Sequence, residues 1–185
     1  MKRILLTIVY IFMAHAAYAV TYAIDTEQSI TDFEVPHVIG FSSGIVKFKD
    51  GKIDFDEKAS ALQSLDLTLD SASITTYNED RDAAMQSEQF LNTAAFPTIS
   101  VRSKKVDAKK LSADVTVRST TKLVSFEYVV GGTGKDENGK ELLAVFLYGK
   151  FNKKDFGIEY NVMDESGKPM LGDEIHVLLK LVGKK

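Results

Sequence analysis

The chain has 185 residues and no cysteine, which excludes a disulfide framework, a thiolate nucleophile and a cysteine-ligated metal centre. Its residues are 44% hydrophobic and 26% charged, which is ordinary for a globular protein and excludes a disordered or collagen-like chain. The 23 basic and 26 acidic residues are scattered along the sequence, so no basic surface for nucleic acid is indicated. The length suits a single domain with a sizeable core.

The amino-terminal segment has the three parts of a secretory signal peptide. Lys2 and Arg3 form a basic region, residues 4–13 are almost entirely apolar, and residues 17–19 supply a small-x-small cleavage pattern. Ten apolar residues rise only about 15 Å as a helix, half of the bilayer core, so cleavage is favoured over a membrane anchor. We expect a signal peptide over residues 1–19, cleavage after Ala19, export to the periplasm, and one folded domain over residues 20–185.

After this segment, apolar and polar residues alternate, which is typical of half-buried β-strands. Asp50-Gly51 lies between two alternating runs and predicts a hairpin turn. The pattern predicts eight or nine short strands and indicates a sandwich or a barrel. Alternation does not distinguish a filled core from a barrel with an apolar, incompletely filled lumen, so both stay open at this point.

Two stretches break the alternation. Residues 78–91 suit a short helix, with Asn78 as its N-cap and acidic residues in its first turn. Residues 131–139 are polar and rich in glycine, and they predict a long hairpin connection.

Few residues could carry chemistry. His37 and His176 are the two histidines that follow the predicted signal peptide, and the sequence has no Gly-x-Ser-x-Gly nucleophile turn. The two histidines could hold a metal together with a carboxylate if they met in space, although histidines at strand ends are the commoner explanation. Residues 131–134 lack the lysine of a phosphate-binding loop. We therefore expect no catalytic residue, no cofactor and no metal site.

Several segments, in order along the chain, match the pattern of one known family. They are residues 22–25 with Ser29, Phe33 and His37; residues 46–48 and 51–56; residues 73–76, 78–79 and 81–85; Phe90, residues 96–99 and Ser103; and residues 152–158. Together they cover almost all of the chain after the signal peptide. They resemble the YceI-like family of exported lipid- and polyisoprenoid-binding proteins.

The chain departs from the family pattern at two places. The opening Asp25-Thr26-Glu27-Gln28-Ser29 lacks the histidine that relatives usually have before the serine. Later, Arg118-Ser119 replaces a His-Gly pair, and Leu123 replaces a proline. Any role that these histidines play in relatives is therefore absent here, which affects head-group preference more than fold.

The resemblance implies an all-β fold with a short helix: an extended, lipocalin-like antiparallel β-barrel of about eight strands, with an apolar tunnel for a long isoprenoid. Each buried five-carbon unit contributes roughly 3–4 kcal/mol, against an association cost of roughly 4–15 kcal/mol, so several units would have to be buried. A one-residue shift in register would move a whole strand's set to the other face. The lipid-binding residues expected from alternation are Phe33, Val35, Val46, Phe48, Ile53, Phe55, Leu67, Val115, Phe126, Tyr128, Phe146, Val177 and Leu179.

Arg81 and Asp82 allow two interpretations. They could be a structural pair that fixes the helix against the barrel, or Arg81 could meet an anionic or polar head group at the tunnel mouth. The leading hypothesis is a periplasmic carrier, not an enzyme, whose partner is a long-chain isoprenoid or similar amphiphile. Nucleic acid and a stable membrane anchor are not expected, and a homodimer is left open. The alternatives are an enzyme acting on such a lipid, with Arg81, Asp82 or His37 near the mouth, and a stress-related interaction protein with a filled barrel.

Overall fold

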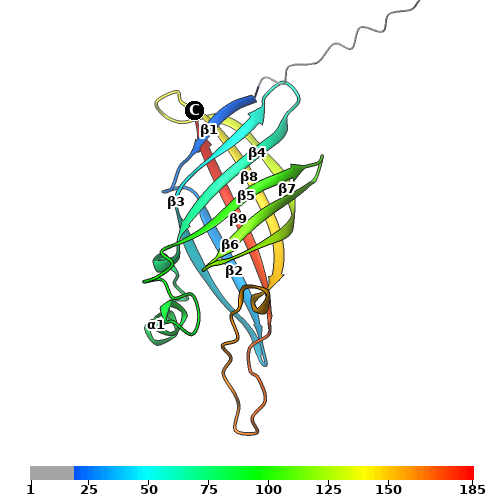
Figure 1. Ribbon diagram of the computed structural model, residues 1–185. Coiled ribbons are helices and arrows are strands. Elements are labelled where there is room, and N and C mark those ends of the chain that lie inside the picture. Colours follow the sequence, from blue (N-terminus) through cyan, green and yellow to red (C-terminus); the bar gives the residue numbers. More distant parts are fainter. Residues whose placement is uncertain (1–18) are drawn as a thin grey trace, which may run out of the picture.

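The computed structural model describes residues 19–185, so nearly all of the predicted signal peptide lies outside the described residues. The described chain forms nine strands, one α-helix and two 3₁₀ turns (Figure 1). In chain order these are β1 (Ala19–Ile24), β2 (Ile30–His37), β3 (Gly40–Asp56), β4 (Ala61–Asp70), η1 (Ser71–Ser73), α1 (Glu79–Gln86), β5 (Thr98–Val106), β6 (Lys110–Val117), β7 (Thr120–Lys135), β8 (Glu141–Asn152), η2 (Lys153–Phe156) and β9 (Glu174–Lys184). Within this part of the chain, no helix combines the length and apolar character needed to cross a bilayer.

The strands close into an antiparallel barrel. Strands β2 to β9 pair in the cyclic order β3-β2-β9-β8-β7-β6-β5-β4, and β4 pairs again with β3. Apart from the β2–β9 contact that completes the circle, every neighbouring pair in this ring is consecutive in sequence. The two long connections, residues 71–97 and 153–173, contain α1 and η2. The predicted all-β barrel of about eight strands is confirmed.

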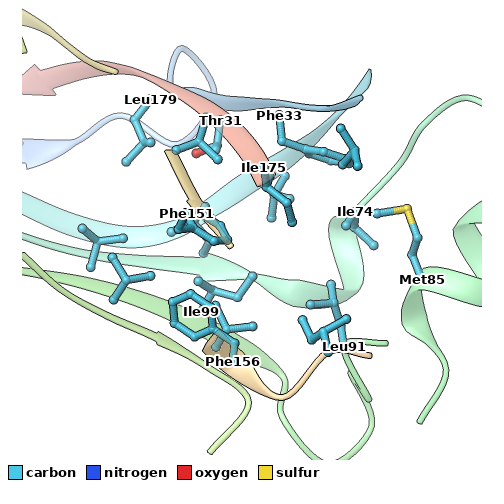
Figure 2. Close-up of a pocket in the computed structure, with 18 of the residues that line it drawn as sticks. Thr31, Phe33, Ile74, Met85, Leu91, Ile99, Phe151, Phe156, Ile175 and Leu179 are labelled. Carbon is cyan, nitrogen blue, oxygen red and sulfur yellow. The ribbon is translucent and has the colours of Figure 1, made fainter. Parts of the chain in front are cut away.

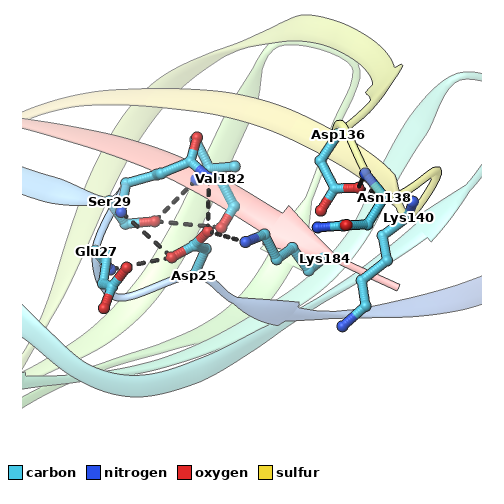
Figure 3. Close-up of polar contacts among 9 residues, drawn as sticks. Asp25, Glu27, Ser29, Asp136, Asn138, Lys140, Val182 and Lys184 are labelled. Carbon is cyan, nitrogen blue, oxygen red and sulfur yellow. Dashed lines mark hydrogen bonds and ion pairs between the residues drawn. The ribbon is translucent and has the colours of Figure 1, made fainter.

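The remaining strand, β1, occupies the same place in the barrel wall as β2. Both strands lie between β3 and β9, with β1 at one end of the barrel and β2 along the rest. The turn between them is tied to β9: the Val182 amide donates to Ser29 Oγ at 2.9 Å, and the Lys184 ammonium lies 2.7 Å from the Asp25 carboxylate (Figure 3). These contacts hold the wall together where it changes from one strand to the next.

The hairpin predicted at Asp50-Gly51 is wrong. Strand β3 runs without a break through both residues, and its pairing with β4 shifts by one residue between Phe48 and Asp50. This β-bulge changes which residues face inward, so Phe48 and Ile53 both point into the barrel although they are five positions apart. The sequence signal marked a real irregularity of the backbone, but one that lies within a strand.

Two further boundaries differ from the prediction. Helix α1 starts after its Asn78 N-cap as predicted but ends at Gln86, because Ser87 caps it and the chain then turns Phe90 and Leu91 inward. The expected long connection over residues 131–139 is mostly strand. Its turn is closed by Asp136, whose carboxylate accepts the Asn138 and Lys140 amides (Figure 3).

The interior is packed tightly in the half of the barrel that lies away from α1 and η2. Side chains with at most 3% exposure fill it, among them Tyr22, Ile53, Phe55, Leu62, Leu65, Leu111, Leu143, Val145 and Leu181. The apolar space that the family resemblance implies therefore does not lie among these side chains. The open space lies at the other end, between the strand ends, α1 and η2.

Candidate functional site

An apolar cavity of about 100 Å³ occupies this end of the barrel. Figure 2 shows its walls converging from the barrel strands and from the segments that cover their ends, with Met85 on α1 and Phe156 on η2 among them. The cavity is apolar except for Thr31, whose buried hydroxyl has no hydrogen-bond partner. The lining residues are Thr31, Phe33, Val35, Val46, Leu69, Ile74, Met85, Phe90, Leu91, Ile99, Val101, Val115, Val117, Phe126, Phe151, Phe156, Ile158, Ile175, Val177 and Leu179.

Two aromatic rings of the wall are held in place by glycines on neighbouring strands. A Cβ atom at Gly44 would lie 2.6 Å from the Phe33 ring, and one at Gly149 would lie 2.5 Å from the Phe126 ring. Each ring therefore packs against the backbone of a glycine, where a side chain would collide with it.

A second hollow, of about 350 Å³, adjoins the cavity and leads to the surface. It shares Phe33, Val35, Met85 and Phe90 with the cavity wall, so one side of it continues the apolar surface. Its remaining rim is largely polar. The polar residues there are His37, Ser42, Thr76, Asn78, Asp80, Arg81 and Lys153. We call this second hollow the mouth.

Arg81 and Asp82 meet through Thr76 at the mouth. The Arg81 Nε atom donates to Thr76 Oγ1 at 2.7 Å, and that hydroxyl donates to the Asp82 carboxylate at 2.6 Å. Asp82 also accepts the Thr76 amide and the Thr75 hydroxyl, both at 2.7 Å. Burial acts to raise the pKa of Asp82, but these hydrogen bonds outweigh it and hold the pKa below its usual range. Asp82 thus fixes the chain before α1, whereas the exposed Arg81 also faces the mouth.

Lys153 is a buried cation that sequence reasoning missed. Its side chain is 1% exposed, and its ammonium donates to the Tyr160 carbonyl at 2.8 Å and lies 3.6 Å from Asp173. Burial lowers its pKa, although Asp173 opposes that shift. Alternation could not identify it, because it lies in η2 and not in a strand. Its one signal was its place in the segment 152–158 that resembles the family.

The predicted lipid-binding residues fall into three groups. Phe33, Val35, Val46, Val115, Phe126, Val177 and Leu179 line the cavity. A second group is buried in the barrel but does not line the cavity: Phe48, Ile53, Phe55, Leu67 and Tyr128. Of these, Phe55 borders a separate surface hollow at the far end of the barrel.

Phe146 lies on the outer face of β8, because Val145 and Leu147 on either side of it point inward and are fully buried. The prediction that Phe146 faces the lumen is wrong. Strand β8 is apolar on both faces, so alternation does not indicate which of its residues face inward.

Six of the thirteen missed lining residues lie outside the predicted strand runs, and the other seven, such as Leu69 and Val101, lie within them. Ile74, Met85, Phe90, Leu91, Phe156 and Ile158 belong to turns, to α1 or to η2. The two histidines do not meet in one site: His37 borders the mouth, and His176 contacts Glu174 at 2.9 Å on β9. Over residues 19–185, no group of three or more His, Asp or Glu side chains is arranged to hold a metal ion.

Comparison with known families and structures agrees with this architecture. The YceI-like domain model matches residues 22–183. The chain belongs to the YceI-like family. Protein YceI of Escherichia coli O157:H7 is 33% identical over 170 residues, which cover 86% of this chain and 88% of that protein. Protein YceI of Salmonella arizonae is 31% identical over 156 residues, with 80% and 81% coverage.

Several solved structures share the fold. The Campylobacter jejuni YceI protein superimposes with a TM-score of 0.62 at 26% identity, covering 75% of this chain and 82% of its own. Burkholderia cenocepacia BcnA has a TM-score of 0.71 at 15% identity, with 86% and 98% coverage. A polyisoprenoid-binding domain from Saccharophagus degradans has a TM-score of 0.61 at 12% identity, with 88% and 97% coverage. The last two likenesses establish the fold alone.

Proposed function

We propose that this YceI-like protein is an exported binding protein or carrier for an isoprenoid or a similar amphiphile, and that it performs no chemistry on its ligand. The observation that carries the proposal is the pairing of an apolar cavity with an adjoining mouth that has polar side chains on part of its rim. A molecule with a hydrocarbon tail and a polar head matches both parts at once. The polyisoprenoid-binding domain of Saccharophagus degradans, which has the same fold, supports this choice of ligand.

The energetics favour a tail over a rigid polar ligand. The cavity offers apolar contact on almost every side, so each methylene group that enters it gains about 0.8 kcal/mol. A charged or strongly polar group would lose its hydration there and find a single hydroxyl, that of Thr31, in return. The polar end of the ligand therefore belongs at the mouth.

Arg81 is our candidate for the head-group contact. Its guanidinium has five donors, and two hydrogen bonds to Thr76 use only part of that capacity. If Arg81 binds the head group, Arg81→Ala weakens binding of a phosphorylated isoprenoid by about 1.5–3 kcal/mol and leaves the neutral alcohol unaffected. Arg102→Ala, which removes an exposed arginine on β5 far from the mouth, is the matched control. Equal losses for both lipids would leave Arg81 with a structural role only.

Export is proposed from the amino-terminal pattern of a basic region, an apolar run and a small-x-small site. Cleavage between Ala19 and Val20 would leave almost the whole of β1 in the mature protein. Amino-terminal sequencing of periplasmic material should then begin at Val20. Recovery of a form that retains Met1 in the membrane fraction would show an anchor instead.

Solvent extraction of the purified protein, followed by mass spectrometry, tests the carrier proposal against its rivals. A lipid released intact, at near-stoichiometric amounts, is the expected result. Conversion of an added isoprenoid into a new product would show an enzyme. The packed half of the barrel is the observation that favours an interaction protein without a ligand, and the absence of any bound or bindable lipid would support that alternative.

A further inference from the structure

The end of the barrel that carries the mouth also carries most of the exposed large apolar side chains. Nine such side chains are exposed among residues 19–185, and five of them lie here, on the β2–β3 hairpin and on the loop after η2. Figure 1 shows both segments extending beyond the barrel at the end where α1 lies. We call these five residues the apolar tip: Val38, Ile39, Phe41, Val162 and Met163.

Backbone hydrogen bonds join the two segments of the tip. The Val38 amide donates to the Met170 carbonyl at 3.2 Å, and the Gly172 amide donates to the Pro36 carbonyl at 2.8 Å. Within the loop, the Met170 amide donates to the Val162 carbonyl at 2.7 Å. The loop therefore continues the hairpin sideways, and the exposed apolar side chains belong to one connected extension of the barrel wall.

The apolar tip borders the mouth directly. Val162 belongs to both, and His37 and Ser42, which also line the mouth, flank the apolar turn of the hairpin in the sequence. A surface that touches the tip would therefore lie against the mouth. This continuity favours a bilayer over a protein partner, because a protein seated here would cover the opening, whereas a bilayer is the phase in which an isoprenoid tail dissolves.

The charges around the tip favour a zwitterionic bilayer over an anionic one. Residues 38–42 carry no charged side chain. Among residues 157–172, Glu159, Asp164 and Glu165 are exposed, and Lys168 is the one exposed cation. Anionic membranes are bound through clusters of basic side chains, and neither segment of the tip carries one. Exposed apolar side chains, by contrast, gain free energy wherever they leave water for the interfacial region of a bilayer.

We propose that the apolar tip docks reversibly on the surface of a zwitterionic bilayer and so brings the mouth to the membrane. An isoprenoid tail then passes between the bilayer and the barrel without crossing bulk water. Docking gives the proposed carrier its partner, and in this respect the proposal rests on the proposed function. The docking itself depends on the tip alone, so it is measured separately from lipid retention.

A tryptophan at the tip reports docking, because the sequence contains no tryptophan of its own. Ile39, which is 92% exposed, is replaced in Ile39→Trp, and Val129→Trp on the outer face of β7 is the matched control. With phosphatidylcholine vesicles we expect the emission of Ile39→Trp to shift to the blue and that of Val129→Trp to stay unchanged. Adding phosphatidylglycerol should strengthen binding by less than about threefold, because the tip has no basic cluster. No shift at either position, or equal shifts at both, would overturn the proposal.

Flotation with phosphatidylcholine vesicles measures the contribution of the apolar side chain. Ile39→Asp should lower the vesicle partition coefficient about tenfold, because one large apolar group no longer leaves water. Val129→Asp should float like the parent, and melting temperatures confirm that both variants fold. Light scattering identifies the other occupant: a parent that dimerises through the tip, becomes monomeric in Ile39→Asp and does not float would show a second copy there and overturn the proposal.

Prenol retention after gel filtration, with the prenol supplied without vesicles, tests the carrier function independently. We expect Ile39→Asp to retain the prenol as the parent does while it loses flotation. A parent that floats but retains no prenol would contradict the carrier function and leave the docking in place. A parent that retains the prenol but does not float would overturn the docking and leave the carrier function in place.

Discussion

Asp25 shows how a single carboxylate secures the junction between β1 and β2. Its side chain is 8% exposed, lies 2.7 Å from the Lys184 ammonium and accepts the Glu27 amide at 3.0 Å. The hydrogen bond from Lys184 is the largest influence on this group and, against the effect of burial, lowers the pKa of Asp25. The residue matches the opening motif of the family, and its role in this structure is to join strands.

Replacing this carboxylate should destabilise the barrel in a pH-dependent way. Because the pKa of Asp25 is lower in the folded state, its contribution is present above the unfolded pKa of about 3.9 and is lost as the pH falls through the folded pKa. We expect Asp25→Asn to lower the free energy of unfolding by about 1.5–3 kcal/mol at neutral pH. The difference from the parent should shrink as the pH falls below about 4.

Thermal melts of both proteins from neutral to acidic pH would measure this difference. Asp66→Asn is the control, because its partner Arg102 is 59% exposed and such surface pairs contribute about 1 kcal/mol or less. A difference for Asp25→Asn that stays constant down to about pH 2 would contradict the assigned role of the ion pair.

At the scale of single residues, the sequence predicted the inner face well where a strand has one apolar face. Phe33 and Phe126 lie on the predicted inner face because both chain neighbours of each are polar, and Val46 does so because it alternates with Lys47 and Phe48. Phe146 is wrong because β8 has apolar residues on both faces, so the choice between Val145 and Phe146 could not be made from alternation. Lys153 could not be predicted as a buried residue, since a charged side chain is normally exposed.

Among the elements, β3 is the one in which a local irregularity determines which residues face inward. The bulge between Phe48 and Asp50 brings Gly51 against the backbone of β4. A Cβ atom at Gly51 would lie 2.8 Å from the Asp66 carbonyl oxygen and 3.0 Å from the Leu67 side chain. A glycine is required here by close approach, and the same close approach explains why a turn-like dipeptide lies within a strand.

Adding one methyl group at this position should therefore disturb the bulge. We expect Gly51→Ala to destabilise the protein by about 1–3 kcal/mol, because the backbone of β4 has to move. Gly134→Ala, at a position with open space around it, should change stability by less than about 0.5 kcal/mol. Urea unfolding of the two variants measures both values. If Gly51→Ala were as stable as the parent, the bulge would have to tolerate a side chain that this structure leaves no room for.

Element boundaries were harder to predict than the number and type of elements. The helix end at Gln86 depends on how Phe90 and Leu91 pack into the cavity wall, which is a tertiary effect. Likewise, residues 131–135 extend β7 although glycines are poor strand formers, because they pair with the start of β8. In both cases a long-range contact outweighed the local preference of the chain.

For the molecule as a whole, alternation predicted an all-β sandwich or barrel, the family resemblance favoured the barrel, and neither determined how the interior is filled. A filled interior and a cavity have the same pattern of inward apolar residues, and here one barrel has both. The packed half begins behind Phe48 and Leu67, whereas the cavity exists because α1, η2 and their neighbouring turns cover the strand ends without filling the space. The position of these covering segments depends on tertiary packing that no periodicity encodes.

The central claim is that the cavity between the strand ends and α1 is where the lipid tail binds. Two identical substitutions test it most directly: Val115→Phe places a ring in the cavity, and Val129→Phe places one on the outer face of β7, where the valine is 55% exposed. Retention of a four-unit prenol after gel filtration is measured for both, with melting temperatures to confirm folding. We predict that Val115→Phe loses about tenfold or more of the bound prenol while Val129→Phe keeps it. Equal retention by both folded variants would place the lipid outside this cavity and contradict the account.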